Sequence, residues 1–139
     1  MKLIVMESQG VWAAALRRLP AGAASIRETR SLPECEAELV ATPASFVVAE
    51  LLLANASALL DRMTAWEARF PAAVFAVVAG RELASWGELV REAGAIDFVT
   101  SPRELTPLSV AIARHFERKG TAPRSLADRI LAELPLAPS

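Results

Sequence analysis

The run Phe46-Val47-Val48-Ala49-Glu50 decides the fold of this chain. Its first four residues are all apolar, which is typical of a strand buried on both faces of a parallel sheet. The acid Glu50 follows directly, and open α/β sheets gather functional groups just beyond the carboxyl ends of their strands. Glu50 is therefore a candidate functional residue, and the residues at the same sheet edge decide what the site can do.

Other short apolar runs flank this strand and alternate with helical segments. We expect strands at 2–6, 25–30, 46–51, 73–78 and 96–100, and helices at 11–19, 32–41, 58–70, 85–93 and 105–117. Parallel neighbours need crossover connections, so this alternation predicts a doubly wound α/β fold with helices on both faces of the sheet.

Length and composition indicate a single domain. The chain has 139 residues, of which 53% are apolar and 22% charged, enough for one well-buried core. We expect a domain at 1–120 and a C-terminal extension at 121–139, in which 125–134 has the pattern of a short helix.

Charge and cysteine content exclude several classes of function. The net charge is -1, so nothing favours nucleic acid or a membrane surface, and the apolar start is too short for a signal peptide or a membrane span. We expect a cytoplasmic protein. The single cysteine, Cys35, excludes an internal disulfide, and its flanking acids Glu34 and Glu36 favour an inert thiol.

Three segments, in this order, resemble the receiver domain of two-component response regulators. They are Leu3-Ile4-Val5-Met6-Glu7, Phe46-Val47-Val48-Ala49-Glu50-Leu51 and Gly94-Ala95-Ile96-Asp97-Phe98-Val99-Thr100-Ser101-Pro102. The resemblance covers roughly residues 1–118. It implies a flavodoxin-like, five-stranded sheet of order 2-1-3-4-5 and a cis bond between Ser101 and Pro102.

The resemblance also implies a chemical site. Receivers phosphorylate themselves on an aspartate that ends the third strand, and an acidic pair after the first strand holds Mg²⁺. A Thr or Ser after the fourth strand and a Lys after the fifth complete the site. The matching positions in this chain hold Glu50 for the aspartate, Glu7 and Ser8 for the acidic pair, Val78 for the hydroxyl and Ser101 for the lysine.

These departures predict that the phosphorylation switch is lost. The extra methylene of Glu50 moves its carboxylate by about an ångström, which spoils in-line geometry. One acid is left for a metal, whether the pair is Glu7 and Ser8 or, in the other register, Met6 and Glu7, so we expect no Mg²⁺ site. The chain then resembles a degenerate receiver, or pseudo-receiver, that is not an enzyme.

Several of these residues have a plainer interpretation. Glu50 is either a fixed mimic of a phosphoaspartate or a hydrated polar residue at a strand end. Glu7 is either a remnant metal ligand or an acid favoured by the dipole of the first helix. His115 has no partner in the sequence pattern and is expected at the surface, and Trp12 and Trp66 are expected to pack in the core or at its rim.

We expect a regulatory or protein-interaction module whose partner is a protein, with a homodimer as one possibility. The expected surface is the fourth helix, fifth strand and fifth helix, where charges of both signs could pair across a two-fold axis. Its candidate residues are Trp86, Glu88, Arg91, Asp97, Arg103, Arg114 and Arg118. Two alternatives stay open: a receiver that still accepts a phosphoryl group or weakly binds a divalent metal, and a flavodoxin-like binder of a small molecule.

Overall fold

The computed structural model describes residues 2–19 and 25–118 and has the predicted alternation of strands and helices. Its elements are β1 (Leu3–Met6), α1 (Val11–Arg17), β2 (Ile26–Thr29), α2 (Leu32–Ala41), β3 (Phe46–Glu50), α3 (Ala56–Arg69), β4 (Val74–Val78), the 3₁₀ helix η2 (Arg81–Trp86), α4 (Gly87–Glu92), β5 (Ala95–Val99) and α5 (Thr106–Arg118). The predicted helix at 125–134 lies outside the described residues.

The five strands form one parallel sheet of order β2-β1-β3-β4-β5, which confirms the predicted order. β3 is central and pairs with β1 on one side and β4 on the other. Both faces of β1, β3 and β4 are buried, which explains why these strands are unbroken apolar runs.

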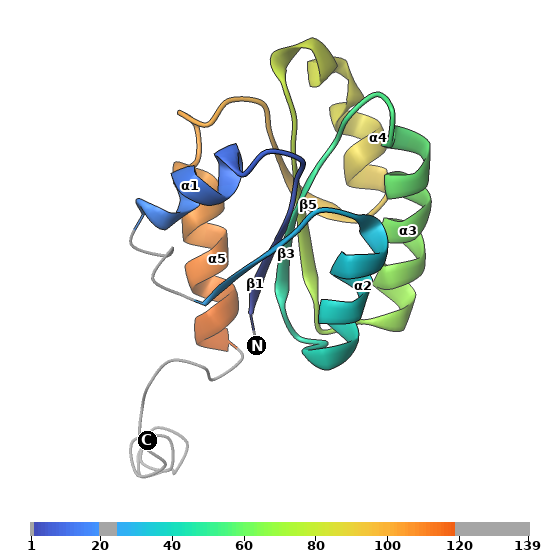
Figure 1. Ribbon diagram of the computed structural model, residues 1–139, viewed down its shortest axis with the longest axis vertical. Helices are drawn as coiled ribbons and strands as arrows, with labels where there is room; N and C mark the ends of the chain where they lie inside the picture. The colour runs from blue at the N-terminus through green and yellow to red at the C-terminus, as the bar shows by residue number, and fades with distance from the viewer. Residues whose placement is uncertain (1, 20–24, 119–139) are drawn as a thin grey trace, which may run out of the picture.

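Helices cover the two faces of this sheet unequally. Figure 1 shows α1 and α5 on one face and α2, α3 and α4 on the other. Successive strand residues point to opposite faces, so Leu3 and Val5 pack with α1 and α5, whereas Ile4 and Met6 pack with the other three helices. The result is two separate apolar layers with the sheet between them.

Local sequence signals set several helix ends. Ser31 caps α2 by accepting a hydrogen bond from the Glu34 N–H, with Pro33 in the first turn, as predicted. Gly94 follows α4 with φ of 115°, a conformation that only glycine adopts readily. The helix expected at 85–93 is shorter than predicted, because its beginning is the 3₁₀ turn of η2.

His115 is fully buried, so the prediction of a surface histidine is wrong. It lies on the inner face of α5 with Leu108 and Ile112, at helical spacing. Its ring meets Phe46 edge-on at 5.7 Å, and Nε2 lies 2.6 Å from the Ala44 carbonyl oxygen. These contacts account for a polar side chain inside an apolar layer.

The bond between Ser101 and Pro102 is trans, so the predicted cis bond is also wrong. Residues 101–104 form a turn that the Glu104 N–H closes on the Ser101 carbonyl at 2.9 Å. Pro102 occupies the second position of this turn, where the fixed φ of a trans-linked proline fits well.

No helix in the described parts of the chain is long and apolar enough to cross a membrane.

Trp12 and Trp66 are buried as predicted, and Trp86 is half-buried against the layer formed by α2, α3 and α4. The Trp66 indole N–H donates to Glu36, which also joins Arg62 and Arg69 and ties α2 to α3.

Cys35 is expected to be chemically silent in the folded protein. Burial, together with Glu36 and Glu38, raises the pKa of its thiol to about 12. At pH 8 the thiolate is then about one part in ten thousand, and the side chain is inaccessible. Iodoacetamide should leave the native protein unmodified and alkylate it fully in urea, as read by intact mass. Rapid alkylation of the native protein would contradict this packing.

Candidate functional site

The carboxyl ends of the strands bring the predicted positions into one row. Glu50 pairs in register with Val78 on β4, and Val78 pairs with Val99 on β5. On the other side of β3, Met6 pairs with Ala49, so Glu7 and Ser8 follow directly at the same edge. These positions therefore lie together at one edge of the sheet, and the contacts made there determine what the edge can do.

Glu7 caps the first helix. Its two carboxylate oxygens accept hydrogen bonds from the N–H groups of Trp12 and Ala13, at 2.9 and 2.7 Å. Gly10 occupies the N-cap position with φ of 86° and has no side chain to cap the helix, so Glu7 supplies the missing acceptors. Glu7 is only 2% exposed, and the structure favours the helix-terminus interpretation over that of a metal ligand.

Glu50 holds the same loop from the other side. One oxygen, Oε1, accepts hydrogen bonds from the Ser8 N–H at 2.9 Å and from the Ser8 hydroxyl at 3.2 Å. The side chain is half-buried. It therefore differs from the freely hydrated carboxylate considered from the sequence. The additional methylene of a glutamate helps the carboxylate to reach across from β3 to the loop after β1.

Two residues outside the predicted site help Glu7 and Glu50 to hold the loops at this edge. We call these four residues the clamp. Arg30, just after β2, donates from Nη1 to the Glu7 carbonyl at 3.2 Å. Asn55 donates to the Glu50 carbonyl at 3.1 Å and accepts from the Leu52 N–H at 2.8 Å, which fixes the turn after β3. Neither contact follows from sequence spacing.

The far side of the row lacks the hydroxyl after β4 and the lysine after β5 that the resemblance implies. Val78 is fully buried and apolar, so it can neither donate nor accept a hydrogen bond. The Ser101 hydroxyl accepts from the Arg103 N–H at 3.2 Å, within its own turn. The positions of the switching hydroxyl and the lysine are therefore occupied by groups with structural contacts.

The residues at this edge do not fit the Mg²⁺ that the resemblance implies. Mg²⁺ takes a near-octahedral set of oxygens, usually with one or two carboxylates. Both Glu7 oxygens accept hydrogen bonds from N–H groups, and only one Glu50 oxygen, Oε2, accepts none from the described residues. Within residues 2–19 and 25–118, no cluster of three or more His, Cys, Asp or Glu side chains could hold a metal.

The predicted interaction surface contains more apolar area than its charges suggested. Leu89 on α4 and Ile96 on β5 are 52% and 50% exposed, and Val110 on α5 is also exposed. Arg91 lies 3.9 Å from Asp97 of the same chain and contacts the Ile96 carbonyl, so this pair is closed within the molecule. Leu89 and Val90 are adjacent on α4 and only Val90 faces the core, so the helical spacing around Val90 is the signal that could have revealed Leu89.

The remaining charges on this surface are divided between its two helices. On α4, Glu88 is exposed, and on α5, Arg114 and Arg118 are exposed. Arg103 is exposed in the turn between β5 and α5. Trp86 is half-buried at the start of α4. Arg91 on α4 and Glu117 on α5 are exposed as well, so both helices carry charges of both signs.

Comparison with known proteins gives matches only at the level of structure. No family model matches the sequence, and no curated protein matches it.

Solved structures of receiver domains share the fold. A CheY-like protein, TadZ, from Pseudomonas aeruginosa is 21% identical, with a TM-score of 0.63 over 81% of this chain and 93% of that one. A receiver domain from Clostridium thermocellum is 18% identical, with a TM-score of 0.67 over 86% and 97%. The beryllofluoride-activated NtrC4 receiver domain dimer is 15% identical, with a TM-score of 0.68 over 84% and 96%. At these identities the likeness shows the fold alone: this chain has the receiver fold.

The two glutamates should contribute unequally to stability. Glu7→Gln removes the charge and turns an amide N–H toward a backbone N–H, so the free energy of unfolding should fall by roughly 1–3 kcal/mol. Glu50→Gln keeps an acceptor for Ser8 and should cost less than about 1 kcal/mol. Urea denaturation of both variants compares a buried carboxylate bound through both oxygens with a half-buried one bound through a single oxygen. An equal loss in the two variants would contradict the assigned contacts.

Proposed function

We propose that this receiver-fold domain is a non-phosphorylatable module that binds a protein partner through α4, β5 and α5. One observation carries the first half of the proposal. The carboxylates of Glu7 and Glu50, at the positions that match the acidic pair and the phosphorylated aspartate, accept hydrogen bonds from N–H or O–H groups of the chain itself. An edge whose acids hold its own loops in place has no need of a metal or a phosphoryl group to order it.

The chemistry of phosphoryl transfer supports this reading. A carboxylate nucleophile needs a free oxygen aimed at the donor, and the developing charge needs a cation and hydrogen-bond donors around it. Glu50 is oriented toward Ser8, and the matching partner positions hold Val78 and Ser101. We infer that neither efficient phosphorylation nor Mg²⁺ binding takes place here.

The contacts of Glu50 also weigh against a fixed mimic of phosphoaspartate. A mimic would have to transmit its charge to the residue beside it on β4, and that residue is Val78. An apolar side chain does not change its position in response to a neighbouring negative charge through hydrogen bonding. Glu50 is better described as a structural residue whose hydrogen bonds from Ser8 connect the loop after β1 to the end of β3.

The second half of the proposal rests on the exposed face of α4, β5 and α5. Exposed apolar side chains at the centre of a patch with charges at its rim are typical of protein interfaces. Leu89 and Ile96 provide the apolar centre, and the NtrC4 receiver structure noted above is a dimer. The partner is a protein, either a different chain or a second copy of this one.

Phosphodonor treatment should leave the protein unmodified. Incubation with acetyl phosphate and Mg²⁺ followed by intact mass spectrometry is expected to show no phosphoryl adduct. Glu50→Asp alone should not restore one, because Val78 and Ser101 still offer no phosphate-binding groups. Robust labelling of the unmodified protein at Glu50 would overturn the proposal in favour of a receiver that still accepts phosphate.

A photo-crosslinking residue tests the surface in the native cell. Replacing Ile96 with benzoylphenylalanine should give a discrete protein adduct on irradiation, and adding Leu89→Lys should abolish it, because an ammonium group would be desolvated at the interface. The matched control carries the same residue at Ala58, which is exposed on α3. Equal adducts at both positions, or none at position 96, would refute this surface.

A further inference from the structure

The sheet has two edge strands, β5 and β2, and within the described residues the outer side of β2 is free. β2 pairs with β1 only. The Leu3 N–H donates to Ser25 and the Glu7 N–H to Thr29, so the odd-numbered residues of this strand face β1. The N–H and C=O groups of Ile26 and Glu28 consequently point away from the sheet. No described residue forms a backbone hydrogen bond with them.

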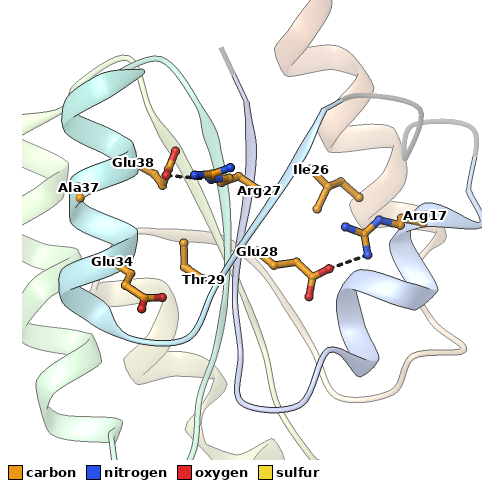
Figure 2. A pocket seen from close by; sticks show the side chains of 8 residues that line it. All are labelled: Arg17, Ile26, Arg27, Glu28, Thr29, Glu34, Ala37 and Glu38. Carbon is orange, nitrogen blue, oxygen red and sulfur yellow. Dashed lines mark hydrogen bonds and ion pairs between the residues drawn. The ribbon is translucent and has the colours of Figure 1, made fainter.

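The charged side chains of β2 bind residues on the two flanking helices. Figure 2 shows Arg27 reaching toward Glu38 on α2 and Glu28 reaching toward Arg17 on α1, with β2 open between the two helices. The two ion pairs measure 3.0 and 2.7 Å. A groove of about 370 Å³ runs along the strand here. Its walls carry charges of both signs. Glu28 and Glu38 are each paired with a base of the same chain, whereas Glu34 accepts a hydrogen bond from the Arg30 N–H and has no ion pair with a described residue.

The ion pairs favour the charged forms of Glu28 and Glu38. The hydrogen bond from Arg17 lowers the pKa of Glu28, and the hydrogen bond from Lys2, with a further contribution from Arg27, lowers that of Glu38. Except at Glu34, an approaching strand therefore meets paired charges in place of the unpaired, protruding charges with which edge strands usually repel one another. The outward N–H and C=O groups of Ile26 and Glu28 are therefore accessible to a second strand, and the ion-paired charges beside them do not repel it.

We propose that this edge pairs with the β2 strand of a second copy, antiparallel, about a two-fold axis at Arg27. In that register each Ile26 faces the other copy's Glu28, and each such pair exchanges two backbone hydrogen bonds. The register uses the free groups of both residues. It ends where the free groups end, since the Arg30 N–H is already bound to Glu34 at 2.7 Å.

The side chains suit a second copy better than an unrelated strand. Arg27 meets its own equivalent across the axis, and each guanidinium is bound to Glu38. Each facing guanidinium is thus paired with a carboxylate of its own copy, which reduces the repulsion between the two arginines. A long foreign strand would find only two free residues to bind, whereas a two-fold match needs only these two.

The pairing is independent of the proposed function and compatible with it. β5 forms the opposite edge of the sheet, so the joined sheets would place the α4, β5 and α5 surfaces at their two far ends. A dimer through β2 would therefore present two identical partner-binding surfaces, and avidity for a partner that is itself repeated would follow.

A single cysteine tests the register. The two Arg27 positions would be directly opposite in a non-hydrogen-bonded pair, so Arg27→Cys should form a disulfide-linked dimer under mild oxidation. Cys35 is buried and does not compete. Ala58→Cys, exposed on α3, is the matched control and should remain monomeric. Failure of Arg27→Cys to cross-link above the level of this control would overturn the proposal.

Ile26→Pro tests the hydrogen bonds without touching the β1 ladder, because it removes an outward N–H from an edge strand. Sedimentation equilibrium should show dimers of the unmodified chain and of Ile26→Val, weakened at least tenfold by Ile26→Pro, with thermal melts confirming that each variant is folded. A monomeric unmodified chain would overturn the proposal. So would a dimer that survives Ile26→Pro and is lost on Ile96→Asp, since that result assigns pairing to β5. If Ile26→Pro does not fold, the cross-link at position 27 decides.

Discussion

The bond between the Glu7 carboxylate and the first N–H groups of α1 is the contact on which this edge of the molecule depends. The first turn of a helix leaves N–H groups unsatisfied, and Gly10 at the N-cap has no side chain to accept from them. Glu7 accepts from two of them while nearly fully buried. A buried carboxylate without these partners would be strongly unfavourable, so the acid and the helix start require each other.

The rest of the carboxyl edge is arranged around this cap. Arg30 binds the Glu7 carbonyl from the side of β2, and Glu50 binds Ser8 from the side of β3. The loop after β1 is therefore held from both sides by groups of the protein. In the receiver fold this edge is where function is expected. Here the same positions produce a fixed structure, and the exposed apolar area lies elsewhere, around Leu89 and Ile96.

Sequence patterns predicted the strands, their order and the location of Glu7, Glu50 and Val78, because apolar runs and their periodicity are local properties. They did not predict that Arg30 and Asn55 complete the clamp, since those contacts depend on which loops meet in space. His115 was misplaced because a histidine among Arg and Glu residues reads as exposed, although its spacing from Leu108 and Ile112 puts it on the buried face. The trans bond at Pro102 depends on the turn that follows it.

Hydrogen exchange at the amides of Ser8, Trp12 and Ala13 tests the central claim most directly. These three N–H groups donate to the two glutamates, so we expect them to be protected well above the exposed Gln9 amide. We also expect that protection to be unchanged by Mg²⁺ and a phosphodonor. Fast exchange at all three amides, or a clear change on adding Mg²⁺, would show that this edge becomes ordered only when a ligand binds. Either result would contradict the account.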